Sequence, residues 1–342
     1  MNAITATAMN SKPSRDWSVL VYAIETWSTK LELPADSVEF CPTRPECFVV
    51  GTYKLNEETR NRNGAVVVFR RTGNTCDRVG VYEVPGVLDL KWSCDNLAVA
   101  LSDGTVQVRR LLSTDNGAVN IDTIAETGPS GAGSLALALC WNSTEPEKLT
   151  TSYSNGEVSV LRFSESELER EQTWKCHDFE AWNVAWDSTD RHVFYTGGDD
   201  CLLKIWDTRC PEGVRTIRRH SMGVTAIQSN PSTAHLLATG SYDETVFFWD
   251  TRTMRTPVEE TAVGGGVWRL KWNRKDPQLL AVAAMHGGAC VLRYSADSQT
   301  AQCVSKFTKH ESMVYGIDWA EDGALASCSF YDHSLYLWNA GL

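Results

Sequence analysis

One hydrophobic pattern recurs seven times along the 342 residues of the chain. Each copy begins with a short run of strand-forming residues that usually ends in an aromatic side chain. About a dozen residues later come a second run, a polar turn and a third run. The first runs lie 42 to 52 residues apart and cover residues 37–40, 89–92, 138–141, 183–186, 225–228, 269–272 and 316–319, the fifth ending in Gln228.

This period predicts the fold. Repeats of this length, each with several short strands, are typical of the four-stranded blades that surround the channel of a β-propeller. We therefore expect an all-β, seven-bladed β-propeller. Residues 17–342 should form a single propeller domain, and the polar residues 1–16 should form a flexible tail.

Three copies resemble the WD-repeat family. In that family a His before the first strand, a Ser or Thr, the turn Asp and a Trp form a hydrogen-bonded set inside the blade. The resemblance implies this structural role for His177, Asp200 and Trp206 in the fourth copy, for His220, Thr239, Asp243 and Trp249 in the fifth, and for His310, Asp332 and Trp338 in the seventh.

The two ends of the chain are predicted to meet. The sequence stops just after the third run of the seventh copy, so the fourth strand of that blade must come from elsewhere. Residues 17–24 form a strand-like run near the N-terminus. Pairing the two ends would close the ring and protect its edges, so we expect removal of residues 1–26 to unfold the protein.

Composition narrows the range of partners. The net charge of −11 argues against a sequence-independent grip on nucleic acid or on an anionic membrane surface, and no apolar run approaches the ~18 residues that span a bilayer. The 11 cysteines include no C-x-x-C pair, which favours a reducing compartment and gives no support for a zinc site. We expect a cytoplasmic monomer without metal or cofactor.

Several blocks depart from generic blade sequence, namely residues 35–42, 51–53, 177–182, 195–200, 219–224, 265–269 and 312–316. In this order they closely resemble the diphthine methyl ester hydrolase family, which consists of WD-repeat proteins. The resemblance extends over roughly residues 35–338 and is densest from 177 to 332. Loops 54–64 and 113–134 depart from the family pattern.

The resemblance implies an esterase that acts on elongation factor 2. A modified histidine of that factor has an arm with a trimethylammonium group and a carboxylate capped as a methyl ester. Hydrolysis of the ester would give diphthine and methanol in diphthamide biosynthesis. The sequence contains neither a G-x-S-x-G nor an H-E-x-x-H motif. A non-catalytic scaffold or adaptor for trafficking or ubiquitin-ligase assemblies therefore stays open as the alternative.

One mouth of the channel is the predicted binding site. The residue four before the end of each first run should face it, which selects Asp36, Leu88, Leu137, Trp182, Val224, Trp268 and Tyr315. Asp199, Tyr242 and Tyr331 precede a turn residue and should rim the same face.

A cluster of this kind suits a quaternary ammonium group, because cation–π contacts contribute about 0.5–2 kcal/mol each. Carboxylates would add to the attraction, and Asp36, Glu180 and Asp199 are the candidates. Aromatic rims also mark protein interfaces, and both interpretations hold if the substrate is itself a protein.

The sixth copy supplies the candidate catalytic residues. His286 stands at the position of the turn Asp, with glycines at 264–266 in place of the structural His and Leu292 in place of Trp. Imidazole, with an ordinary pKa of about 6.5, can act as a general base at neutral pH. We predict that His286 activates water or a neighbouring hydroxyl, and that Arg269 or the backbone N–H groups of 264–266 stabilise the oxyanion. The alternative is a loop histidine bonded to backbone.

Overall fold

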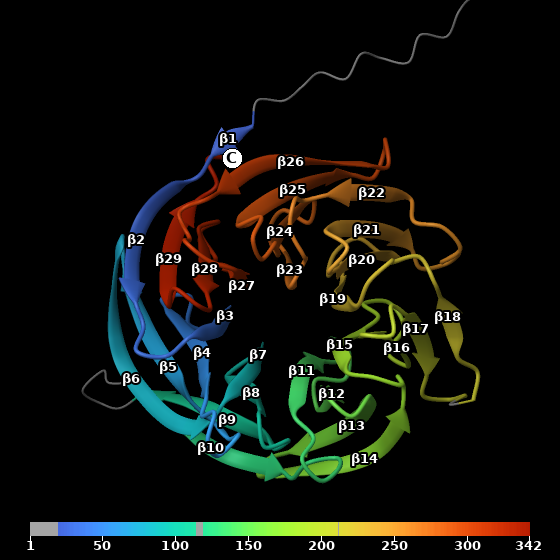
Figure 1. Ribbon diagram of the computed structural model, residues 1–342, viewed down its shortest axis with the longest axis horizontal. Helices are drawn as coiled ribbons and strands as arrows, with labels where there is room; N and C mark the ends of the chain where they lie inside the picture. Colours follow the sequence, from blue (N-terminus) through green and yellow to red (C-terminus); the bar gives the residue numbers. More distant parts are fainter. Residues whose placement is uncertain (1–19, 114–118, 211) are drawn as a thin grey trace, which may run out of the picture.

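Seven blades, each with four antiparallel strands, stand around a central channel in the computed structural model, which describes residues 20–113, 119–210 and 212–342 (Figure 1). The all-β, seven-bladed propeller is confirmed. The predicted tail, residues 1–16, lies outside the described residues. In the part of the chain that the structure describes, no helix has the length and apolar character needed to cross a membrane.

Blades 1 to 3 are formed by strands β3 to β14, in chain order. Each runs from the channel outward in chain order, and their strands are β3 (Ala35–Phe40), β4 (Cys47–Leu55), β5 (Arg62–Thr72) and β6 (Thr75–Pro85); β7 (Val87–Ser93), β8 (Asn96–Leu101), β9 (Val106–Ser113) and β10 (Val119–Thr127); and β11 (Ala136–Trp141), β12 (Lys148–Tyr153), β13 (Glu157–Ser164) and β14 (Glu167–Lys175).

Blades 4 to 7 complete the ring. Their strands are β15 (Ala181–Trp186), β16 (Val193–Gly198), β17 (Leu203–Asp207) and β18 (Arg215–Ile217); β19 (Val224–Ser229), β20 (Leu236–Ser241), β21 (Thr245–Asp250) and β22 (Glu259–Ala262); β23 (Arg269–Trp272), β24 (Leu279–Ala283), β25 (Ala289–Ser295) and β26 (Thr300–Phe307); and β27 (Val314–Trp319), β28 (Leu325–Ser329) and β29 (Ser334–Asn339), with β2 as the outer strand.

The N-terminal segment closes the ring, but the strand that does so begins further along the chain than predicted. β2 (Ile24–Lys30) pairs antiparallel with β29, and β1 (Val21–Tyr22) adds a short parallel strand to β26 of blade 6 (Figure 1). The expected strand over residues 17–24 is therefore wrong in its bounds, and residues 17–19 lie outside the described residues. The side chain that anchors the closing strand is Trp27, whose ring centroid lies 5.8 Å from that of Phe69 in blade 1.

The hydrophobic core is divided into seven clusters, each lying between two neighbouring blades. A blade that is apolar on both faces buries those faces by packing between its two neighbouring blades. Closing the ring therefore completes the hydrophobic core, because the cluster between blades 7 and 1 exists only when the ends of the ring meet.

Two of the three WD sets are confirmed. In blade 5, His220 contacts Asp243 at 2.9 Å and Thr239 at 2.9 Å, and the Trp249 indole donates to the same Thr239 hydroxyl. The set in blade 4 is arranged in the same way around Thr196.

Blade 7 departs from the expected set. His310 contacts Ser327 and Ser334, each at 2.7 Å, and not the predicted Asp332, whose carboxylate accepts from the backbone N–H of Glu311. With hydroxyl partners in place of a carboxylate, burial lowers the pKa of His310 to about 4.

The aromatic residue at the end of an inner strand connects neighbouring blades. Trp141 donates its indole N–H to the carbonyl of Lys91 at 2.9 Å, and Trp319 donates to that of Lys271 at 2.9 Å. In each case the acceptor is the residue just before the strand-ending position of the preceding blade. Trp272 donates in the same way to Gln228, which places the end of the fifth copy at Ser229. The predicted fifth run, 225–228, was therefore out of register by one residue, because that blade has no aromatic side chain to mark its end.

Removal of residues 1–30 is expected to unfold the protein, because it deletes β1 and β2 and opens the cluster between blades 7 and 1. Thermal unfolding followed by circular dichroism measures this, and a variant lacking residues 1–19, which keeps both strands, is the matched control. A soluble 31–342 fragment with a cooperative transition like that of the control would contradict ring closure by β2.

Candidate active site at one mouth of the channel

A cavity of about 360 Å³ opens where the inner strands begin, and most of the residues predicted to face this mouth line it. It includes six of the seven channel-facing positions predicted from the repeat, and the exception is Val224, which is fully buried in the core between blades 4 and 5. Thr225 takes its place, as the corrected register of the fifth copy requires. The lining residues include Asp36, Leu88, Leu137, Glu180, Trp182, Thr225, Tyr242, Trp268, Arg269 and Tyr315.

A β-bulge explains why these side chains enter the channel. In six blades the pairing register shifts by one residue near the start of the inner strand. A bulge leaves one residue of the strand unpaired, and the side chain of that residue no longer follows the face-to-face alternation of the residues around it. The unpaired residues are Asp36, Leu88, Leu137, Trp182, Thr225 and Tyr315.

The aromatic side chains form a continuous wall on one side of the cavity. The Trp268 ring centroid lies 5.6 Å from that of Trp182, 4.9 Å from that of Tyr315 and 6.0 Å from that of Tyr242. The Trp182 indole N–H donates to the carboxylate of Asp199 at 2.9 Å. Asp199 is exposed and does not line the cavity, but this bond positions one ring of the wall. Of the predicted rim residues, Tyr331 also lies outside the lining and is 61% exposed.

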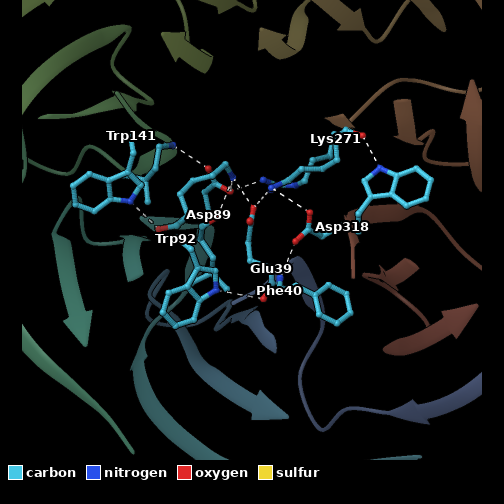
Figure 2. A network of polar contacts seen from close by, with 12 residues as sticks. Glu39, Phe40, Asp89, Trp92, Trp141, Lys271 and Asp318 are labelled. Atoms are coloured by element: carbon cyan, nitrogen blue, oxygen red, sulfur yellow. Dashed lines mark hydrogen bonds and ion pairs between the residues drawn. The ribbon is translucent and has the colours of Figure 1, made fainter. Parts of the chain in front are cut away.

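A buried charge network occupies the centre of the channel below the cavity. Figure 2 shows Glu39, Asp89, Lys271 and Asp318 facing one another from four inner strands. Each member forms an ion pair with the next, so the charges alternate in sign along the network, in the order Asp36, Arg269, Asp89, Lys91, Glu39, Lys271 and Asp318.

The contacts differ along this buried charge network. In its middle, Lys91 lies 2.7 Å from Asp89 and 3.1 Å from Glu39. The contacts at the two ends are longer, since Asp36 lies 3.5 Å from Arg269 and Asp318 lies 3.7 Å from Lys271.

Position in the network determines the acidity of its carboxyls. Burial alone would raise the pKa of Asp89, but Lys91 and Arg269 lower it to about 2. For Asp36 burial prevails over the longer contact with Arg269 and over a hydrogen bond from Trp268, and raises the pKa to about 7. Burial likewise raises the pKa of Asp318 at the other end.

His286, the predicted general base, does not line the cavity. It is exposed in the turn between β24 and β25. The backbone at Gly265 packs against the 284–287 turn with no room for a side chain, because a Cβ there would lie 2.1 Å from the carbonyl oxygen of Ala284 and 2.4 Å from the nitrogen of Gly287. The structure thus brings Arg269 into the cavity with the aromatic wall but leaves His286 outside it.

Sequence reasoning missed the participation of Tyr53 and Arg62, which line the cavity from blade 1, and of the network beneath it. A signal for the network was present in the sequence. The position just before the end of the inner strand holds Glu39, Lys91, Lys271 and Asp318 in four copies, and charges in otherwise buried strands need partners. Among the described residues, no group of three or more His, Cys, Asp or Glu is arranged to hold a metal ion.

Comparison with known proteins agrees with this architecture. Residues 168–207, 212–250 and 301–339 match the family described as WD domain, G-beta repeat. A diphthine methyltransferase of Mus musculus is 36% identical over 84% of this chain and 68% of its own length, and one of Schizosaccharomyces pombe is 35% identical over 89% and 94%. A chain in a crystal structure of the mitotic checkpoint complex has a TM-score of 0.72 at 19% identity, covering 99% of this chain and 98% of that chain, which supports the fold alone.

Repeats, ring and channel define a WD-repeat β-propeller with a candidate site at one mouth of its channel. Within that class, the chain belongs to the diphthine methyltransferase family. The family resemblance found in the scattered sequence blocks is thereby confirmed.

The charge network predicts a difference between two lysines. Lys271→Met is expected to lower the free energy of unfolding by about 3–5 kcal/mol, because it leaves Asp318 and part of the charge of Glu39 buried without a cationic partner. The control is Lys275→Met, which breaks an exposed pair with Glu321 and should cost less than about 1 kcal/mol. Urea denaturation of both variants measures the difference, and equal small losses would show that the network contributes nothing to stability.

Proposed function

We propose that this protein hydrolyses the methyl ester of diphthine methyl ester on elongation factor 2, giving diphthine and methanol. Membership in the diphthine methyltransferase family supports a role in diphthamide biosynthesis. The observation that supports hydrolysis is the cavity itself, which sets an aromatic wall beside a buried carboxyl and a buried guanidinium.

The aromatic wall and nearby carboxyls suit the trimethylammonium end of the arm. Trp182, Trp268 and Tyr315 present contiguous rings to a cavity whose lining also includes Glu180. The negative faces of the rings attract a cation whose methyl groups cannot donate strong hydrogen bonds. Because the ester is on the same arm, binding the ammonium group would hold the ester within the same small space.

Arg269 suits the ester end. Its guanidinium is buried against Asp89 and Asp36, and its Nε makes no hydrogen bond to any described residue. A fixed positive donor in a water-poor site stabilises the oxygen on which negative charge develops during attack on an ester. We assign Arg269 to this oxyanion.

The surrounding face suits a protein substrate. Phe179 and Met222, which precede two inner strands, are 61% and 50% exposed, and Tyr331 extends from the turn after β28. Exposed apolar side chains next to a cavity are typical of a surface that binds another protein. We propose that elongation factor 2 docks on this face in the cytoplasm.

The mass of the modified peptide tests the function. Purified protein is incubated with elongation factor 2 carrying the methyl ester, and the modified peptide is then weighed. Loss of one methylene mass unit supports hydrolysis, whereas a gain in the presence of S-adenosylmethionine would support the methyl transfer that the relatives' names describe. An unchanged mass with tight binding would support the scaffold alternative and contradict the proposal.

Two tryptophans test recognition of the cation. Trp182→Ala and Trp268→Ala are each expected to raise the dissociation constant for the trimethylammonium arm about 2- to 30-fold, the equivalent of one cation–π contact. A substrate with a neutral tert-butyl group in place of the ammonium should lose affinity for the wild type and differ little between wild type and variants. Trp174→Ala, on outer strand β14, controls for the loss of a tryptophan outside the cavity. Variants that bind the charged arm as well as wild type would contradict the assignment.

His286→Ala tests the role predicted for that histidine. A general base contributes about 10²–10⁴-fold to the rate, so a drop of this size with substrate binding retained would place His286 in the mechanism. Since the side chain is exposed, the variant should fold normally. Full activity of His286→Ala would exclude the residue as the base.

A further inference from the structure

The buried charge network contains one more carboxyl than cations. Three cations, Lys91, Arg269 and Lys271, face four carboxyls, Asp36, Glu39, Asp89 and Asp318. Uncompensated charge in the interior is costly, so one carboxyl is favoured to hold a proton. The two ends of the network, where the carboxyl has a single, long contact with a cation, are the places for it.

Only one of these ends meets the aromatic cavity. Asp36 lines the cavity although it is just 2% exposed, whereas Asp318 lines the cavities at the far end of the inner strands. The bulge at the start of β3 turns the Asp36 side chain inward beside Arg269. A carboxyl that can take up and release a proton therefore stands where the substrate arm is proposed to bind.

On the basis of the proposed function, we propose that Asp36 is the general base that activates water for attack on the ester, with Arg269 as the partner that holds the oxyanion. The ionised carboxylate removes a proton from water as the oxygen bonds to the ester carbon, and the carbonyl electron pair moves to the oxygen beside Arg269. When the tetrahedral intermediate collapses, the bond to the methoxy oxygen breaks and Asp36 returns the proton to it. Water and ester are thus converted to acid and methanol.

The groups around Asp36 make it a suitable base. Burial, which raises its pKa to about 7, is only partly opposed by Arg269, while Asp89 adds to the rise. A general base is most effective when its pKa lies near the working pH. The titratable groups that interact with it from other elements are Tyr53 of β4, Asp89 and Lys91 of β7, Tyr242 after β20, Arg269 of β23, Tyr315 of β27 and Cys328 of β28, and Glu39 follows on its own strand. Two further charged groups, Arg62 of β5 and Glu180 before β15, line the same cavity.

Ionisation of Asp36 should weaken the fold. Its pKa is raised in the folded state above the ordinary value of 3.8, so between pH ~4 and ~7 the folded protein holds a proton that the unfolded chain has lost. Stability attributable to this proton is present at low pH and is lost as pH rises through about 7. A merely structural ion pair would give the opposite trend, because its carboxylate would stabilise the fold at high pH.

The experiment is the pH dependence of kcat/KM for hydrolysis of the methyl ester on elongation factor 2, measured for wild type, Asp36→Asn, Asp36→Glu and Asp318→Asn. Wild type should show an ascending limb near pH 7. Asp36→Asn should lose about 10²–10⁴-fold in rate together with this limb, yet melt at pH 8 no lower than wild type. Asp36→Glu should recover part of the rate. Asp318→Asn, the matched change at the other end of the network, should keep both the rate and the limb.

The outcomes separate two failures. An inactive wild type would overturn the proposed function and, with it, this inference. An active wild type whose limb persists in Asp36→Asn would overturn only the role of Asp36. Destabilisation of Asp36→Asn at pH 8, with activity lost in proportion to unfolding, would show that Asp36 has a structural role and would also overturn it.

Discussion

Two cations on one strand hold the centre of this ring together. Arg269 and Lys271, both on β23, contact four carboxyls from blades 1, 2 and 7: Asp36, Asp89, Glu39 and Asp318. The apolar clusters join only neighbouring blades, whereas the contacts with the carboxyls of blades 1 and 2 cross the channel. Buried charges are tolerated only with partners, so the inner strands are held in one mutual register. That register fixes the cavity above the network.

The same inner strands explain how a repeated fold forms a single site. Six of the seven blades supply a bulged residue to the channel mouth, and the type of that residue is free to vary because it is not needed for pairing. Blades 2 and 3 supply Leu88 and Leu137, while blades 1, 4 and 7 supply Asp36, Trp182 and Tyr315. The cavity is therefore apolar on one side and aromatic and acidic on the other, which suits an arm with a cation at a short distance from an ester.

The sequence predicted the architecture well because the period and the WD sets are local signals. It predicted most of the cavity for the same reason: one offset from the strand end selected the right residue in six blades, and failed at Val224 where Gln228 offered no aromatic marker. His286 was selected because its local partners were missing, but the backbone at Gly265 packs directly against the 284–287 turn, so blade 6 has a structural substitute for the absent set. The network escaped prediction because its pairs join residues up to 233 positions apart, which only the closed ring brings together.

The account requires that the carboxyl at the mouth of the channel keeps its proton near neutral pH because the network already has enough negative charge. The most direct measurement is the titration of the Asp36 carboxyl carbon by NMR in protein labelled with ¹³C at aspartate carboxyls, with Asp36→Asn to assign the resonance. The account predicts a midpoint near pH 7, far above the ~4 of an ordinary aspartate. A midpoint at or below ~4 would mean that Arg269 holds Asp36 as a permanent ion pair, and would contradict the account.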